Sequence, residues 1–360
     1  MPPDGGAEET GRMDCSKLLP IACLLMAVAG VPGGAAGAPP QSADTRRYVI
    51  ADALFLQRNN ATREQALVVN ATDTNVPVVT ANGLDSKIGT GARLFYGDYG
   101  CDSLGWEVGY TGIYGMDVDR WFESDADILQ AGGQPGFAEA TGLIDGERAD
   151  VSYRSQINSL EANTIFHSFD GGPDRRSPYP WQRSPGYDGG HVDWLLGVRW
   201  AGLEEAAQLA ITPGGYPTAN TYDVQTSSNL FAAQVGTRGR WAWQNWAFEG
   251  WMKIGIAGSV LSQSQSMFDQ LVPDDPFRSP RSSDDLGMGM IADINASLIY
   301  RLTDTWGLRL GYNLFWLTGV ALAPDSWDLT TNTGPDAGTE IRSTGSVFLN
   351  GANVGVEARW

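Results

Sequence analysis

Apolar and polar residues alternate with a period of two along most of the chain after residue 47. The pattern is clearest in the last stretch, 346–360. One face of this stretch carries Phe348, Ala352, Val354, Val356, Ala358 and Trp360, and the other carries Gly351, Asn353, Gly355, Glu357 and Arg359. Because successive side chains of a strand point to opposite faces, the alternation predicts a strand with a different environment on each side.

Ten segments have this character, and each has about the length that a tilted strand needs to cross a bilayer. The predicted strands are 48–58, 88–98, 104–115, 153–168, 191–202, 229–241, 246–261, 286–302, 306–319 and 345–360. Alternation alone does not separate a membrane barrel from a soluble β-sandwich, since the strands of a sandwich alternate as well.

The connections between the predicted strands separate these two folds. Tight connections at 98–103, 242–245 and 303–305 alternate with long ones at 59–87, 116–152, 203–228, 262–285 and 320–344. Short inner turns and long outer loops are typical of outer-membrane barrels. Segment 170–190 breaks the rule, because it is long where a short inner turn is expected. It is either an insertion or a missed strand pair, which would make twelve strands.

The pattern therefore predicts an all-β fold, a single antiparallel up-and-down transmembrane β-barrel over residues 48–360 after a short N-terminal segment, 39–47. The closing strand ends on an aromatic residue, Trp360. Outer-membrane barrels place aromatic side chains at the membrane interface. We expect Trp360 to anchor this strand there and to be recognised by the barrel insertion machinery.

Residues 1–38 have the composition of a secretory signal peptide. A short apolar core at 18–30 follows Lys17, and small residues at 36–38 precede Pro39. The basic region before the core fits better if translation starts at Met13. We expect cleavage after Ala38 and export to the bacterial outer membrane, with the lipid of that membrane as a partner.

Composition narrows the class of protein. The chain has 45 Gly and 13 Trp but only 18% charged residues, and its formal net charge is −18. This charge argues against a nucleic-acid partner, because phosphate binding requires clustered Lys and Arg. After removal of the signal peptide Cys101 is the single thiol, so no internal disulfide is expected.

Several stretches resemble a known family. They are 246–255 (WAFEGWMKIG), 311–324 (GYNLFWLTGVALAP) and 350–357 (NGANVGVE), with a further similar block at 196–200 (LGVRW) followed by Glu204 and Glu205. These stretches are similar to a bacterial family of outer-membrane β-barrel porins. The resemblance covers most of 48–360 and implies an outer-membrane barrel. The substrate of that family is undefined, so the resemblance assigns no functional residues.

Catalytic and cofactor motifs are absent from the sequence. It has no phosphate-binding loop, no Gly-x-Ser-x-Gly turn and no Cys or His pair with metal-ligand spacing. After the signal peptide the only histidines are His167 and His191, which fall near the inner ends of two predicted strands. We therefore expect no enzyme activity, no cofactor and no metal centre.

Acidic residues gather in the predicted loop 116–152. They are Asp117, Asp119, Glu123, Asp125, Asp127, Glu139, Asp145, Glu147 and Asp150, against Arg120 and Arg148. The stretch from Glu123 begins like a calcium-binding loop but has Ile128 and Gln134 where such a loop requires Gly and Glu. The simplest interpretation is a solvated acidic surface. The alternative, more specific hypothesis is that this acidic surface contacts divalent cations or envelope partners.

The charges on the inward faces are balanced. The predicted lumen-lining residues are Arg93, Glu107, Glu161, Asp193, Arg199, Arg238, Glu249, Lys253, Asp293, Arg309, Glu357 and Arg359. A ten-stranded barrel is narrow, so such charges are able to pair across its interior. Balanced pairing favours a closed, structural or surface-interaction barrel, whereas the family resemblance favours a porin-like protein for passive or gated diffusion of small solutes. The sequence leaves both open, with an enzyme carried by the loops a distant third.

Overall fold

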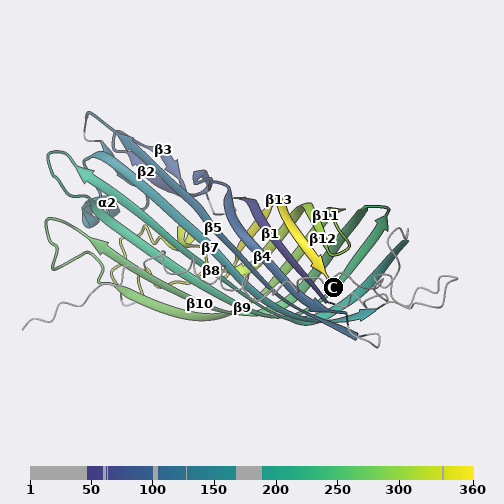
Figure 1. Ribbon diagram of the computed structural model, residues 1–360. Coiled ribbons are helices and arrows are strands. Elements are labelled where there is room, and N and C mark those ends of the chain that lie inside the picture. The colour runs from purple at the N-terminus through teal and green to yellow at the C-terminus, as the bar shows by residue number, and fades with distance from the viewer. Residues whose placement is uncertain are drawn as a thin grey trace, which may run out of the picture. The chain divides into compact units, whose positions relative to one another are not determined.

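The computed structural model describes residues 47–59, 62, 64–99, 104–126, 128–167, 189–334 and 336–360. Ten antiparallel strands close into a barrel in the order β1-β4-β5-β7-β8-β9-β10-β11-β12-β13 (Figure 1). Their bounds are β1 Arg47–Arg58, β4 Gly89–Asp98, β5 Leu104–Glu123, β7 Gly146–His167, β8 Gly189–Pro213, β9 Asn220–Trp243, β10 Trp246–Phe268, β11 Arg281–Arg301, β12 Trp306–Val320 and β13 Gly345–Arg359.

The first and last strands of the barrel pair with each other and close it. The β1–β13 register runs from Tyr48 opposite Arg359 to Arg58 opposite Leu349. Two backbone hydrogen bonds extend the seam beyond this register. The N–H of Arg47 donates to the carbonyl oxygen of Trp360 at 2.9 Å, and the N–H of Trp360 donates to that of Arg47 at 3.0 Å. Closure matters because an unpaired backbone group in hydrocarbon costs several kcal/mol.

The ten predicted strands and their order are confirmed, but several predicted bounds are wrong. Most of the connection predicted at 203–228 is strand, because β8 continues to Pro213 and β9 begins at Asn220. Likewise β5 and β7 occupy both ends of 116–152, and β10 and β11 occupy both ends of 262–285. The apolar outward face ends at the membrane boundary, and the prediction ended each strand there. The hydrogen-bonded ladder needs no lipid and continues beyond it.

Three short strands and a helix lie at the end where the long strands project (Figure 1). They are β2 Ala66–Asn70, β3 Asp73–Thr80, β6 Leu129–Ala131 and α2 Phe137–Thr141, with two 3-10 turns, η2 Ala81–Gly83 and η4 Ala323–Ser326. β6 pairs with β7 and joins β2 and β3 to the barrel. Together with segment 321–344 they enclose an apolar core against inward residues of the extension, including Leu209, Tyr222 and Val224.

An apolar belt surrounds the barrel below this extension. Leu196, Ile294, Leu310 and Val354 all point outward and are exposed. Exposed tryptophans cluster near the short-turn end of the wall, at Trp106, Trp194, Trp241, Trp243, Trp246, Trp306 and Trp360. On β12 the next exposed tryptophan, Trp316, lies ten residues after Trp306. At about 3.4 Å per residue and a tilt of about 40°, these rings are about 26 Å apart along the barrel axis, close to the height of a lipid-facing band.

None of the helices in the described part of the chain is long and apolar enough to span a bilayer. The predicted signal peptide and most of the predicted insertion at 170–190 lie outside the described residues, as does Cys101.

The apolar belt yields a test of face assignment. Replacing Leu310, whose side chain is 59% exposed on the outer wall, by Arg should lower the free energy of unfolding by about 2–4 kcal/mol, because it puts a charge into lipid. The matched change Ser152→Arg, on the outward face of the β7 extension, should leave it almost unchanged. Urea titration of the protein refolded in lipid vesicles measures both, and equal costs would contradict the assignment.

The turns yield a test of orientation. With Cys101 first replaced by Ser, Asp274→Cys in the β10–β11 connection should react with a membrane-impermeant maleimide on intact cells. Asp304→Cys, in the short connection between β11 and β12, should react only after cell lysis. The reverse pattern of labelling would invert the topology.

Candidate functional site

The lower half of the barrel interior holds a layer of buried charged side chains. Eleven of the twelve predicted lumen-lining residues are at most 6% exposed, and Arg359 is partly buried. All twelve side chains project inward. Every second residue of a wall strand points into the barrel, and the twelve lie at these positions.

Glu249 on β10 is the centre of this layer. Its carboxylate contacts four arginines, Arg238 at 3.0 Å, Arg240 at 3.0 Å, Arg309 at 2.9 Å and Arg359 at 3.0 Å. Its side chain is fully buried. One acidic group therefore keeps four cations from three other strands together in a site without water.

Glu357 on β13 shares three of these cations. It contacts Arg240 at 2.7 Å, Arg309 at 2.9 Å and Arg359 at 3.2 Å. Two carboxylates between the same arginines reduce the repulsion among the guanidinium groups, so the cluster is able to remain charged while buried.

Asp52 on β1 continues the network to a further cation. Its Oδ1 lies 3.5 Å from Nε of Arg309, and its Oδ2 accepts from Arg93 at 2.7 Å. Arg93 also donates to Asn313 Oδ1 at 2.7 Å. This chain of contacts joins β1, β4 and β12 across the closing seam.

A second branch crosses to the opposite wall. Glu107 on β5 contacts Arg238 at 2.7 Å and Lys253 at 3.2 Å, and Lys253 also contacts Glu161 on β7 at 3.0 Å. The hydroxyl of Tyr48 donates to Glu107 at 2.6 Å. The charged layer thus joins strands on both sides of the barrel.

Two smaller groups complete the layer. Arg199 contacts Asp293 at 3.1 Å. Asp193 Oδ1 accepts from Nδ1 of His167 at 2.9 Å, and its Oδ2 lies 3.5 Å from Nε2 of His191. Both imidazoles therefore interact with one carboxylate near the inner end of the wall.

An aromatic side chain fills the centre of the charged layer. Trp251 projects inward from β10, and its ring lies 4.6 Å from the guanidinium carbon of Arg93 and 5.5 Å from the Lys253 ammonium. Its indole N–H donates to Asp293 at 3.2 Å. Close to it Phe95 packs over Gly109, where an added Cβ would lie 2.2 Å from the ring. Ring and cations together leave little space for water.

An apolar layer lies above the charged one. Inward side chains from nine of the ten wall strands form it, and Leu322 is added by the segment that follows β12. They are Leu54, Leu56, Ile113, Met116, Ile157, Ala201, Leu203, Leu230, Ala232, Ala257, Ile291, Phe315, Leu317, Val320, Leu322, Val347 and Leu349. Both layers are buried from solvent, so neither leaves a water-filled bore between these side chains.

Segment 321–344 folds inward over the apolar layer, and buried polar groups hold it. The backbone N–H of Ala323 donates to Glu205 at 2.9 Å, and Glu205 pairs with Arg58 at 2.7 Å. Arg278, whose side chain is buried, donates to carbonyls of Asn332, Asp328 and Thr330. These bonds fix the backbone of the segment at Ala323 and again at 328–332.

Sequence reasoning missed part of this arrangement. Asp52 and Arg240 belong to the ion-pair network, and Arg58 pairs with Glu205 above it. The alternation of the strands could have found two of them, since Asp52 shares the inward face of Ile50 and Leu54, and Arg240 shares that of Arg238. The inward direction of Trp251 agrees with the predicted faces, since Trp251 shares the face of Glu249 and Lys253 on β10.

The two ends of the predicted acidic loop are the outer extensions of β5 and β7. There Arg148 pairs with Asp150 at 2.7 Å and lies 3.8 Å from Glu123. Asp127 lies outside the described residues. Within the described ranges no three His, Cys, Asp or Glu side chains are placed to hold a metal ion. Contact of this surface with cations remains a prediction.

Comparison with known proteins places the chain in a family. The family described as "putative beta barrel porin-7 (BBP7)" matches residues 51–360. No curated protein matches the chain. Among solved structures the chain resembles the outer-membrane protease OmpT from Escherichia coli, at 8% identity over 88% of this chain and 97% of the other with a TM-score of 0.44. It also resembles a major outer-membrane protein from Thermus thermophilus, at 11% identity over 88% and 100% with a TM-score of 0.34.

The central carboxylate yields a stability test. Glu249→Gln leaves four buried arginines with too little negative charge, so it should lower the free energy of unfolding by about 3–5 kcal/mol. Glu204→Gln, on the exposed outer face of β8, is the matched control and should change it by less than about 1 kcal/mol. Heat-modifiable gel migration across a urea series provides the measurement. Equal behaviour of the two variants would show that the network does not stabilise the barrel.

Proposed function

Because the chain belongs to the beta barrel porin-7 family, we propose that it is a porin-like outer-membrane barrel with a lumen closed to solutes and an outer extension as its working surface. Membership of the family supports the outer-membrane barrel. The packed interior supports a closed lumen, and the strands that project beyond the membrane support a role at the surface.

The apolar layer is the observation that carries this proposal. Ions cross a barrel through a continuous polar path, and a hydrophobic constriction blocks them by excluding water. Here apolar side chains such as Leu56, Leu203 and Phe315 meet across the whole interior. A solute that passed the charged layer below would still have to cross this dry section.

The charged layer supports the same conclusion. A selective pore requires charges that face water and bind a passing ion weakly. The carboxylates of Glu107, Glu161, Glu249 and Glu357 are each paired with a cation of the wall. Charges that neutralise one another stabilise the barrel and leave no excess of either sign to attract a solute.

The remaining expectations form part of the proposal. The chain is exported with cleavage of residues 1–38, is inserted through recognition of Trp360, and has no enzyme activity. The exposed carboxylates on β5 and β7, including Asp119, are able to attract divalent cations near anionic lipid headgroups. These ions would bridge the protein to its membrane.

A gated porin is the second candidate, and one observation favours it. Segment 321–344 connects β12 to β13 and is not itself a strand of the barrel wall. Its displacement would therefore break no hydrogen bonds between wall strands. Arg278 holds it through three carbonyls. Gating would also require the apolar layer to part, because most of that layer belongs to the wall strands.

Planar-bilayer recording separates the two candidates. The refolded wild-type protein should show no stepwise conductance between low and high salt, because the apolar layer excludes water. A double variant, Leu56→Ser with Leu203→Ser, should allow rare ion passage by wetting this layer. Steady channels of the wild-type protein would overturn the closed-barrel proposal. Openings in Arg278→Ala but not in the wild type would favour the gated porin.

A further inference from the structure

The outward face of the long strands changes character above the membrane. On β8, β9 and β10 the outward apolar side chains of the lipid belt end at Trp200, Phe231 and Val260, and beyond Val260 one further exposed ring, Phe268, follows near the end of β10. Beyond them the same face carries hydroxyl, amide and carboxylate groups, Glu204, Gln208, Thr221, Asp223, Gln225, Ser227, Ser262, Ser264 and Ser266. This face lies outside the lipid belt and is free to contact molecules at the cell surface.

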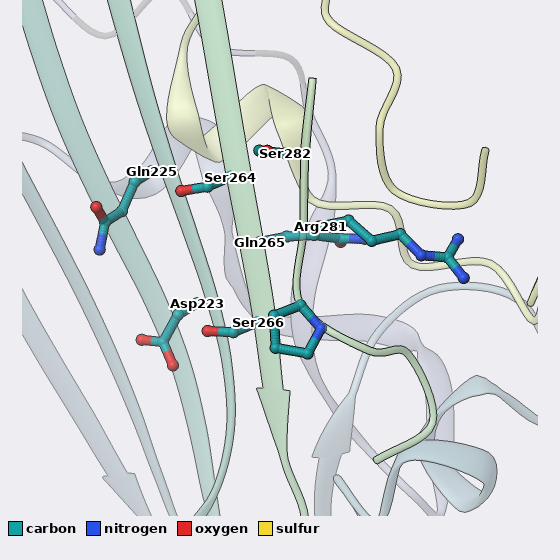
Figure 2. Close-up of a pocket in the computed structure, with 8 residues that line it drawn as sticks. Asp223, Gln225, Ser264, Gln265, Ser266, Arg281 and Ser282 are labelled. Carbon is teal, nitrogen blue, oxygen red and sulfur yellow. The ribbon is translucent and has the colours of Figure 1, made fainter. Parts of the chain in front are cut away.

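A shallow groove runs along this face where β11 begins beside β10 (Figure 2). Its volume is about 380 Å³. The short side chains of Ser264 and Ser266 form its floor, and longer side chains of Asp223 and Gln225 on β9 rise beside them. Ser282 on β11 continues the row of hydroxyl groups. The alternation of short and long side chains across neighbouring strands creates the hollow.

The groove offers hydrogen-bonding groups that the protein does not use. In the described chain the hydroxyls of Ser264, Ser266 and Ser282 and the amide of Gln225 make no side-chain hydrogen bond. The carboxylate of Asp223 is held in place, because Gln208 donates to it at 2.7 Å and Thr221 at 3.1 Å. A ligand would therefore meet several hydroxyls, one amide and one oriented acceptor.

The charges exclude two other ligand classes. Arg281 lines the groove, but its guanidinium points away from Asp223 and Gln225 (Figure 2) and donates to the carbonyl oxygen of Gly334 at 2.5 Å. No free cation of the described lining residues thus faces the groove to bind a phosphate or a carboxylate. An apolar ligand would cover the hydroxyl, amide and carboxylate groups of the groove and leave them without hydrogen-bond partners.

An exposed aromatic ring follows the groove along β10. Phe268 shares the outward face of Ser266, lies opposite Thr221 in the register, and is 39% exposed. A ring beside a row of hydroxyl and amide groups fits a pyranose, which presents an apolar C–H face and a rim of hydroxyls.

We propose that this groove binds a neutral saccharide unit of a surface glycan. The inference rests on the proposed function, since it takes the outer extension as the working surface. Uncharged hydroxyls of the sugar would pair with Ser264, Gln225 and Asp223, and a second sugar would stack on Phe268. A volume of about 380 Å³ suits one or two sugar units.

The test uses the full-length protein in detergent micelles and a panel of neutral oligosaccharides, followed by calorimetric titration of those that bind. Purified lipopolysaccharide and its released, lipid-free polysaccharide form two further arms, which distinguish a lipid-anchored source of the glycan from a free one. Ser264→Trp, which fills the groove, should weaken binding at least about tenfold, as should Asp223→Asn through its lost acceptor. Val76→Trp, at an exposed position of β3 outside the groove, is the control and should bind as the wild type does.

Equal loss in Val76→Trp and Ser264→Trp, or no binding of any saccharide in the panel at millimolar concentration, would overturn the inference. Heat-modifiable migration of each variant verifies that it has folded. The conductance recordings do not depend on this groove, so a closed barrel without saccharide binding would refute the groove alone. Steady wild-type channels with intact saccharide binding would refute the closed lumen alone.

Discussion

Closure of the backbone ladder is the constraint on which the rest of this structure depends. In hydrocarbon a strand cannot leave its N–H and C=O groups unpaired, so β1 has to meet β13 in register along the whole seam. Ten strands close at a diameter that wall side chains are able to fill. Once the ring of strands is closed, the inward side chains of every strand lie together in one narrow interior.

That narrow interior explains the two stacked layers. Near the inner end, charged groups on different strands lie within contact distance, and the cost of removing them from water is offset only by pairing. Glu249 therefore contacts arginines from β9, β12 and β13. Higher in the wall the inward positions are Leu, Ile, Ala and Phe, which pack without partners. Paired charges fill the lower section of the interior, and packed apolar side chains fill the section above it. Together they support the proposal that the barrel interior stabilises the fold and does not conduct ions.

Above the membrane the constraint is relaxed, and the strands serve another purpose. β8, β9 and β10 continue beyond the lipid belt because their inward residues still have a core to cover, formed with segment 321–344 and α2. Their outward residues no longer face lipid, so polar groups such as Gln225 and Ser264 take over. A single set of strands thereby provides a membrane wall below and a hydrophilic recognition surface above.

Period-two alternation predicted the ten strands, because lipid demands an apolar outward face wherever a strand crosses it. The alternation of short and long connections was also needed to predict the barrel. Period-two alternation also assigned the inward side of Asp293 and Arg309. It did not predict the strand ends above the membrane, because no lipid imposes the pattern there. The prediction missed Asp52, which lies between the apolar residues Ile50 and Leu54 on the inward face of β1.

The sequence by itself determined which side of each strand faces lipid, since that choice is local and repeats every second residue. Only the tertiary structure decided which charges meet. Glu249 and Glu357 lie on strands far apart in the sequence, yet they share Arg309 and Arg359, because the register between neighbouring strands brings them to one height. The apolar layer beneath Leu322 and the groove beside Ser264 likewise depend on strand neighbours. Neighbours arise from closure of the whole ring, and no single stretch of sequence contains that information.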